Sequence, residues 1–325
     1  MLPPPAARSK RASKRGSASP LAVFWGILRA NPLTLLGFLL VAAISAAAVV
    51  MVVAPSWLAP YAPLQLTNTR YASPSWQHPM GTDSIRLDVY SEVMYALPFD
   101  LFIALVIAGV SMLLGGGLGL VAGFWDRPGT LGGYASVVIL RLTDIFLSFP
   151  SLILALAIVA FSGISVYSAI GAVLITWWPN YVRLVRGEVL AVKHLPYIQA
   201  ARAAGVSNGR ILSRHVVRNV LEPVVVYFTM DIGTVLVVFS TVAFVIDALP
   251  YPVTSASQRP EWGSMIGHYY TTSLLSTAPW LVLGPGVAIF VTVLAFSLLG
   301  DGLRDVLDPR SRRILASTGR ADRER

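Results

Sequence analysis

The stretch Tyr197–Gly205, which reads Tyr-Ile-Gln-Ala-Ala-Arg-Ala-Ala-Gly, is a short island of polar and small residues between long apolar runs. Alanine and arginine favour helix, and glycine commonly ends one, so the stretch predicts a helix of about two turns. Such a helix is too short to be stable alone in water. Small side chains at Ala200, Ala201 and Ala204 would let another protein approach its backbone closely. The alternative is an ordinary connecting loop with a helical turn, and composition alone favours neither.

The composition around the island indicates a membrane protein. Apolar residues make up 55% of the chain and charged residues only 13%, whereas soluble domains carry about 25% charged residues. There is no cysteine, which excludes disulfides and thiolate chemistry and leaves the redox compartment undecided. The chain is therefore expected to be an all-α integral membrane protein.

Six apolar stretches are long enough to cross a bilayer. They cover about residues 32–54, 98–124, 134–161, 166–185, 222–246 and 278–300. Ser162 and Gly163 separate the third stretch from the fourth, and Pro150 and Pro179 should kink these two helices. The glycines in 115–119 predict a close helix contact, because small residues let two backbones approach each other in lipid.

The basic residues predict the orientation. All but Arg70, Arg86 and Arg259 of the 25 Lys and Arg lie in the two tails, in the turn after the second span or around the island. Six spans place both termini on one side, and the positive-inside rule places them and the island in the cytoplasm, with 55–95 and 247–277 outside. The net charge of +9 is then a topology signal rather than a sign of nucleic-acid binding. The basic tail 1–30 is expected to be disordered and able to touch anionic lipid headgroups.

The sequence gives little support for a catalytic or metal site. The four histidines have no second ligand at metal spacing, and His-Glu-x-x-His does not occur. Gly-x-Ser-x-Gly occurs once, at 205–209 (GVSNG), but it follows a predicted helix and not the strand that a nucleophile elbow needs. The chain also has no Gly-x-x-x-x-Gly-Lys-Ser loop for ATP phosphates. The chain is therefore not expected to be an enzyme. Its energy source is expected to be either another subunit or an ion gradient.

Two acidic residues bear on the ion-gradient alternative, because an acid within the membrane often serves transport. Asp144 lies three residues after Arg141, which favours a structural ion pair within one helix over a pathway role. Asp231 lies inside the fifth span with no basic residue three or four positions away. A packing role and a pathway role both remain open for it.

The island resembles the Glu-Ala-Ala loop of ABC-importer permeases, since Gln199, Ala200 and Ala201 precede Gly205 at the family's spacing. From about His78 to Arg310 the chain is similar to the C-type permease subunit of the dipeptide, oligopeptide and nickel importers. The stretches that carry this resemblance are 78–83 (HPMGTD), 183–190 (RLVRGEVL), 260–265 (PEWGSM), 278–281 (APWL), 299–305 (LGDGLRD) and 307–310 (LDPR).

Several positions depart from the family pattern. Gln199 replaces the loop glutamate and Arg218 replaces a proline, while Arg86-Leu87 stands where the family has Gly-Arg. Phe239 replaces an acidic residue of the fifth span, and 244–249 replaces its glycine-rich end. Because that span helps line the path in such permeases, Phe239 is a pathway or packing candidate, and the substrate cannot be carried over from the family.

The resemblance implies a type I importer permease of six transmembrane helices with a cytoplasmic coupling helix, Tyr197–Gly205, between the fourth and fifth. It divides the chain into the tail 1–30, a first span with an outer segment (31–95), a permease domain (96–303) and a basic tail (304–325). The implied partners are a B-type permease, two ABC ATPases that hold ATP and Mg²⁺, and an extracytoplasmic solute-binding protein. This chain itself would hold no cofactor and would lie in the cell membrane.

Two other functions stay open on the sequence. An ion-coupled secondary carrier would be expected to show inverted repeats, and none is visible by inspection. A membrane scaffold without transport fits the apolar spans but not the family-like loop. Among solutes, the residues do not separate a peptide from an oligosaccharide or a metal chelate.

Overall fold

The computed structural model describes residues 31–248, 260–271 and 277–307. The tail 1–30, most of the predicted tail 304–325 and part of the predicted outer loop 247–277 lie outside these residues, so their predicted disorder and position are not tested. The described part of the chain consists of helices and connecting loops and contains no β-strand. This agrees with the predicted all-α class.

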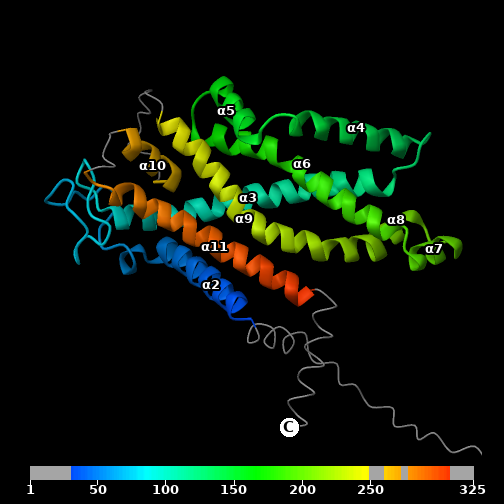
Figure 1. Cartoon of the computed structure of the whole chain (residues 1–325), viewed down its shortest axis with the longest axis horizontal. Helices are drawn as coiled ribbons and strands as arrows, with labels where there is room; N and C mark the ends of the chain where they lie inside the picture. Colours follow the sequence, from blue (N-terminus) through cyan, green and yellow to red (C-terminus); the bar gives the residue numbers. More distant parts are fainter. Residues whose placement is uncertain (1–30, 249–259, 272–276, 308–325) are drawn as a thin grey trace, which may run out of the picture.

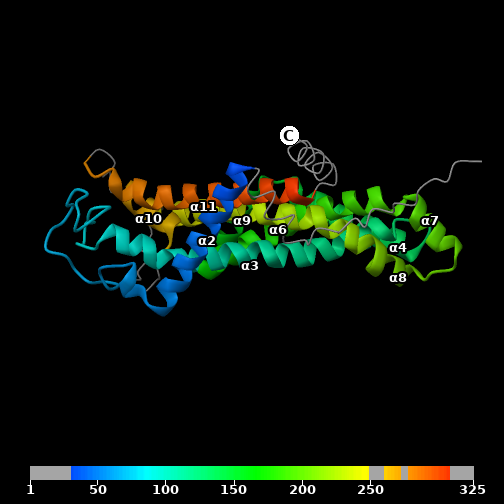
Figure 2. The same ribbon diagram turned by 90° about the horizontal axis from the view of Figure 1, so that it is seen from below.

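Several long helices, α3, α6, α9 and α11 among them, run roughly along the longest axis of the molecule (Figure 1). The longer helices of the described chain are α2 (Pro32–Val53), α3 (Val89–Phe124), α4 (Leu131–Leu147), α5 (Ser151–Ser162), α6 (Val166–Lys193), α9 (Val217–Ala248) and α11 (Trp280–Leu307). The short helices are α7 (Pro196–Ala203), α8 (Asn208–Ile211) and α10 (Trp262–Thr271), with a 3₁₀ turn at Pro55–Trp57 and a π-turn at Leu212–Val216. In two perpendicular views α10 lies at one end of the molecule and α7 at the other (Figures 1 and 2).

Four stretches of the described chain are helical, long and apolar enough to cross a membrane: α2, α3, Asn208–Asp247 and α11. A fifth is obtained if α4 and α5 are counted as one broken span. The fourth predicted span, α6, is not among them: its second half is less apolar and carries Arg183 and Arg186. The structure therefore supports a membrane protein with four or five apolar spans.

Two predicted boundaries were wrong. The helix that contains the predicted span 98–124 begins already at Val89, because Pro98 removes one backbone donor without stopping α3. Asp88 caps this helix by accepting a hydrogen bond from the Ser91 N–H at 2.9 Å. Pro150 does more than kink the third span: α4 and α5 are separate helices that meet at 85°, since the residue before a proline disfavours helical backbone.

Glycines bring α3 and α6 into close contact. A Cβ on Gly115 would lie 2.2 Å from the carbonyl oxygen of Trp178, and one on Gly119 would lie 2.8 Å from that of Val182. Gly117 in the same run faces open space. The predicted helix contact at 115–119 is thus confirmed, and it runs along one face of α3.

Candidate functional site

The predicted helical island is α7, and both of its ends follow local rules. Pro196 occupies the first turn, where its missing N–H is not needed. At the other end Gly205 has φ +77°. The Gly205 N–H donates to the Arg202 carbonyl at 3.0 Å and the Val206 N–H donates to the Ala201 carbonyl at 3.1 Å. This pair of bonds is the Schellman motif that a left-handed glycine permits, so the predicted helix end is confirmed.

One face of α7 is anchored in a small apolar cluster. Ile198 is fully buried there, in a cluster with residues of α3, α6, α8 and α9. The cluster consists of Phe124, Val185, Val189, Val192, Ile198, Ile211, Val216, Val220 and Val224. The Arg202 guanidinium lies 5.7 Å from the Phe124 ring centroid, a cation–π distance. Because α7 is too short to hold itself, this cluster fixes its position.

The opposite face of α7 is open. Tyr197, Gln199, Ala200 and Ala204 are exposed, whereas Ala201 is partly buried against the cluster. The Gln199 Nε2 donates to the His194 carbonyl at 3.1 Å, within the same turn of chain. The exposed surface of α7 is therefore made mainly of small side chains and is flanked by one aromatic ring.

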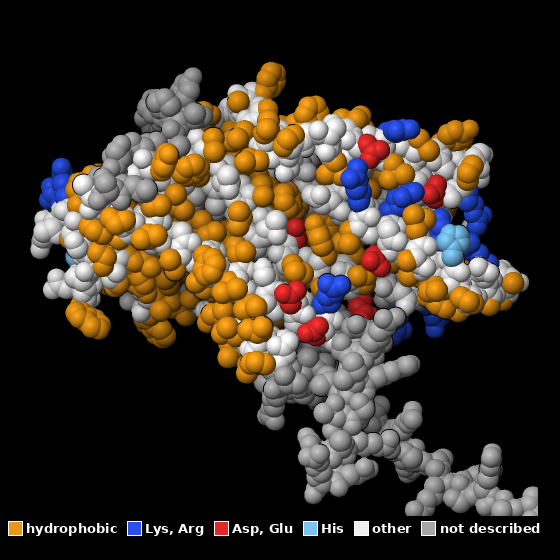
Figure 3. Space-filling view, in the orientation of Figure 1, with side chains coloured by type: hydrophobic (Ala, Val, Ile, Leu, Met, Phe, Trp, Pro, Cys, Tyr) orange, Lys and Arg blue, Asp and Glu red, His pale blue; other side chains and the backbone are white. Residues whose placement is uncertain are grey.

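Lys and Arg gather around this end of the molecule, over α4, α7 and α8, while apolar side chains dominate most of the remaining surface (Figure 3). Two of the arginines on α6 are paired: Arg186 contacts Asp126 at 3.1 Å and Arg183 contacts Asp144 at 2.9 Å. The predicted Arg141–Asp144 pair was wrong. Asp144 pairs between helices, a contact that spacing along one helix cannot indicate.

Asp231 has two hydrogen-bond donors, both from α6. Its Oδ2 accepts from the Trp177 Nε1 at 2.9 Å and from the Tyr181 hydroxyl at 2.8 Å. Only 3% of Asp231 is exposed, and a buried carboxylate of this kind needs such donors. Asp231 therefore holds α9 against α6, the two helices that flank α7 and α8. Phe239, about two helical turns further along α9, is buried in the main apolar core.

A second polar contact, at the α10 end, was missed by sequence reasoning. The first three N–H groups of α10 are satisfied by two buried carboxylates: Asp100 of α3 accepts from Trp262 at 3.0 Å, and Glu261 accepts from Gly263 and Ser264 at 2.8 and 2.7 Å. Burial raises the pKa of Glu261 to about 7, although these backbone bonds oppose the rise. The acid before Trp262 was the available signal, since an acidic residue just before a helix is a typical cap.

Residues 115–313 match the family described as binding-protein-dependent transport system inner membrane component. The dipeptide transport system permease protein DppC of Alkalihalophilus pseudofirmus is 35% identical over 78% of this chain and 81% of its own length. The probable D,D-dipeptide transport system permease protein DdpC of Escherichia coli K12 is 33% identical over 88% and 90%. The glutathione transport system permease protein GsiD of Pectobacterium atrosepticum is 37% identical over 73% and 74%.

These matches settle the function that the sequence left open between three classes. Relatives along most of the chain are transport permeases, which are not enzymes, and ATP is hydrolysed on separate subunits. Permeases of this kind also work with a solute-binding protein, as the family description states. The chain belongs to the binding-protein-dependent transport system inner membrane component family and is a membrane-embedded permease subunit of an ATP-driven ABC importer.

Proposed function

We propose that this chain forms half of the translocation path for peptides and that α7 is its coupling helix. The observation that carries the proposal is the exposed face of α7, a helix that ends at the left-handed Gly205 and is anchored through Ile198 in a cluster with residues of α6 and α9. The peptide class rests on the relatives, which are named for dipeptides, D,D-dipeptides and glutathione. None of the names of these three relatives refers to an oligosaccharide.

The contacts around α7 support rigid-body coupling. Ile198 anchors α7 to the apolar cluster that α6 and α9 share, and Asp231 ties the same two helices together further along. When a closing ATPase pushes on α7, the push passes to α6 and α9 as a unit. A packed interface of this kind switches between discrete arrangements and does not deform gradually.

The proposed topology has six spans: α4 and α5 together form the third, and α6 forms the fourth in spite of its charged second half. Both termini and α7 lie in the cytoplasm, where the positive-inside rule places the arginines. The partners are a B-type permease, two ATPases that hold ATP and Mg²⁺, and an extracytoplasmic solute-binding protein, all at the cell membrane. Asp144, which pairs with the exposed Arg183, and Pro150, at the break between α4 and α5, then have structural roles.

Ala200→Arg tests the coupling role. Ala200 is exposed, unlike its neighbour Ala201, so an arginine fits the free chain and obstructs only a partner that covers this face. We expect the reconstituted complex to assemble and hydrolyse ATP at its basal rate but to lose at least about tenfold in solute uptake, a loss of 1.4 kcal/mol or more. Gln77→Arg adds the same charge to an exposed residue far from α7 and should leave ATPase coupling unchanged. Normal uptake by an assembled Ala200→Arg complex would contradict the proposal.

A further inference from the structure

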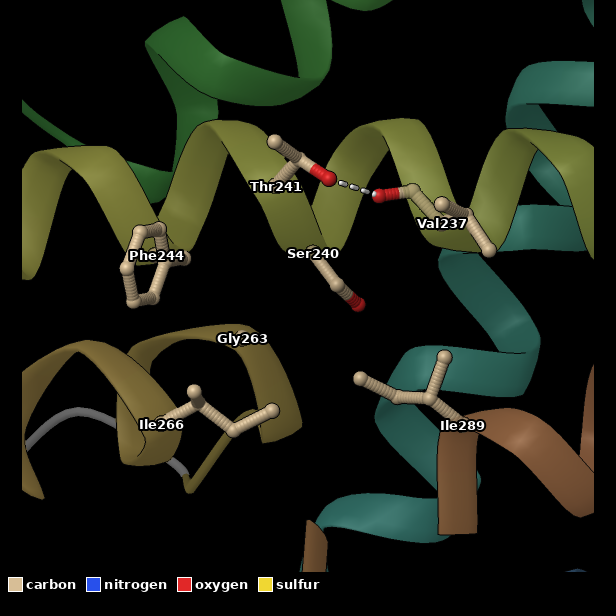
Figure 4. A pocket seen from close by; sticks show the side chains of 7 residues that line it. All are labelled: Val237, Ser240, Thr241, Phe244, Gly263, Ile266 and Ile289. Carbon is tan, nitrogen blue, oxygen red and sulfur yellow. Dashed lines mark hydrogen bonds between the residues drawn. The ribbon is translucent and has the colours of Figure 1, made fainter. Parts of the chain in front are cut away.

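A small cavity opens between α9, α10 and α11 (Figure 4). Its volume is about 160 Å³, close to the roughly 150 Å³ of an engineered protein cavity that binds benzene. The walls are mainly apolar, and the lining residues are Val237, Ser240, Thr241, Phe244, Gly263, Ile266 and Ile289. A group the size of a branched or aromatic amino-acid side chain fits this space.

One polar atom in the wall is unsatisfied. Ser240 is 4% exposed, and its Oγ has no hydrogen-bond partner among the described residues. In Figure 4 this hydroxyl points into the space between Ile266 and Ile289. The hydroxyl of the next residue, Thr241, instead donates to the Val237 carbonyl at 2.7 Å.

Donation to the carbonyl four residues back is the usual arrangement for a helical hydroxyl in this chain. Thr229 and Thr292 also do so, at 2.9 and 2.8 Å. Ser240 has the same option on the same helix, yet its hydroxyl points into the cavity. A buried hydroxyl without a partner costs free energy of about 1–3 kcal/mol, so a bound group that offers a donor or acceptor would recover that cost.

The apolar walls of the cavity and the unsatisfied Ser240 hydroxyl together indicate the class of ligand. A lipid acyl chain would fill the apolar walls but leave the Ser240 hydroxyl unsatisfied. A peptide brings an apolar side chain and, next to it, a backbone N–H and carbonyl. We propose that this cavity is a subsite for an apolar side chain of the transported peptide, with Ser240 bonded to the adjacent peptide backbone.

This inference rests on the proposed peptide-import function and deepens it. The cavity lies on α9, the helix that the chain enters directly after α7, α8 and the π-turn. Gly263 of α10 sits so close to Ser240 that a Cβ there would lie 2.1 Å from the Ser240 carbonyl oxygen, which makes α10 and α9 one wall. Ile289 of α11 is the other wall. A movement of α9 relative to α11 would therefore open or close the subsite as the path changes state.

The test uses the full complex in proteoliposomes, with its ATPases, partner permease and binding protein, and measures uptake of glycyl-leucine and glycyl-glycine. The quantity of interest is the ratio of kcat/KM for the two peptides, relative to the unaltered complex. The binding protein is the same in every assay, so a changed ratio reports on the permease. Because both peptides carry the backbone that Ser240 would bond, we expect Ser240→Ala to lower kcat/KM about threefold to tenfold for each peptide, the size of one hydrogen bond, and to leave the ratio nearly unchanged. Ile289→Trp, which fills the cavity, should lower it about tenfold or more.

Two control variants separate the subsite from general damage. Thr229→Val removes a hydroxyl from the same helix outside the cavity, and Val287→Trp adds the same bulk at a residue of α11 that is 51% exposed. Neither should change the ratio or lower kcat/KM for either peptide. An unchanged kcat/KM in Ser240→Ala, or an unchanged ratio in Ile289→Trp, would overturn the subsite and leave peptide import standing. If Ile289→Trp fails to assemble, Ser240→Ala decides alone. If the unaltered complex takes up neither peptide, the proposed function fails and the subsite fails with it.

Discussion

The two short helices α7 and α10 lie at opposite ends of the molecule (Figure 1) and are held in opposite ways. α7 is defined by its own sequence: a proline begins it, and Gly205 ends it through bonds to its last turn. α10 is also held by residues far away in the chain, although the adjacent Glu261 caps two of its N–H groups. Asp100 of α3 caps it, and the Trp262 Nε1 donates to the Val93 carbonyl at 3.0 Å.

This difference matches what each helix has to do. α7 is anchored on one face through Ile198 and leaves the other face bare, as a helix that a partner covers should. α10 is packed against α9, where Gly263 and Gly267 lie against the backbone at Ser240 and Phe244, and it also packs against α11. Changes in α10 should therefore affect the stability of the chain, whereas changes on the open face of α7 should affect coupling and leave stability nearly intact.

The largest expected effect is that of Gly263→Ala. The added Cβ would lie 2.1 Å from the Ser240 carbonyl oxygen and 2.6 Å from its Cα, and backbone atoms cannot move aside as a flexible side chain could. We expect a loss of about 3 kcal/mol or more in the free energy of unfolding. The measurement is the midpoint of thermal unfolding of the detergent-solubilised chain.

Gly209→Ala, in α8 next to α7, is the matched control. No atom lies within 4 Å of the position that its Cβ would occupy, and alanine in a helix is about 0.5–1 kcal/mol more favourable than glycine. The same substitution should thus stabilise one end of the molecule and destabilise the other. Equal midpoints for the two variants would show that the contrast between the two ends is wrong.

A smaller effect is expected at Asp100. Asp100→Ala removes the acceptor of the Trp262 N–H and should cost about 1–3 kcal/mol, because that donor is left buried and unsatisfied. Asp100→Asn keeps an acceptor at the same place and removes one of two carboxylates that are buried together. We expect the asparagine variant to be at least as stable as the unaltered chain in thermal unfolding. An asparagine variant as unstable as the alanine variant would mean that the negative charge, and not the acceptor, holds α10.

The contrast between α7 and α10 also explains what the sequence could predict. The limits of α7 follow from proline, alanine and glycine preferences that act within a few residues, so they can be predicted without a partner. The glycine contact on α3 could be predicted as well, but its partner residues, Trp178 and Val182, could not. The pairing of Asp144 with Arg183 and the two donors to Asp231 depend on which helices meet. Those contacts join residues 39 to 54 positions apart, and helical spacing carries no information about them.

The smallest change in stability is expected at Gln199, where the chain departs from the family's glutamate. In the free chain the Gln199 Nε2 donates to the His194 carbonyl, and a glutamate carboxylate cannot make that bond. The residue is exposed, so water replaces the lost donor. A negative charge in the first turns of α7 is favoured by the helix dipole, at about 0.3–1 kcal/mol. The two effects nearly cancel, and Gln199→Glu should shift the unfolding free energy by less than about 0.5 kcal/mol.

The effect on coupling should be larger than the effect on stability, because a carboxylate can pair with a basic residue of an ATPase whereas an amide can make only neutral bonds. Charge-assisted bonds are about twice as strong as neutral ones. Glutamine and glutamate have nearly the same shape. The presence of glutamine at 199 in place of the family's glutamate therefore does not require a changed ATPase surface, and the basic residue there can still be present. We therefore expect Gln199→Glu to match or exceed the unaltered complex in solute-stimulated ATPase activity at low salt. The gain should shrink as salt screens the pair.

Gln199→Ala is the control, because alanine makes neither the neutral nor the charge-assisted bond. Its solute-stimulated ATPase activity should be lower than that of the unaltered complex and that of Gln199→Glu. A clear loss of stimulated activity in the glutamate variant at low salt would instead indicate an uncharged pocket in the ATPase, in which the new carboxylate is desolvated without a partner.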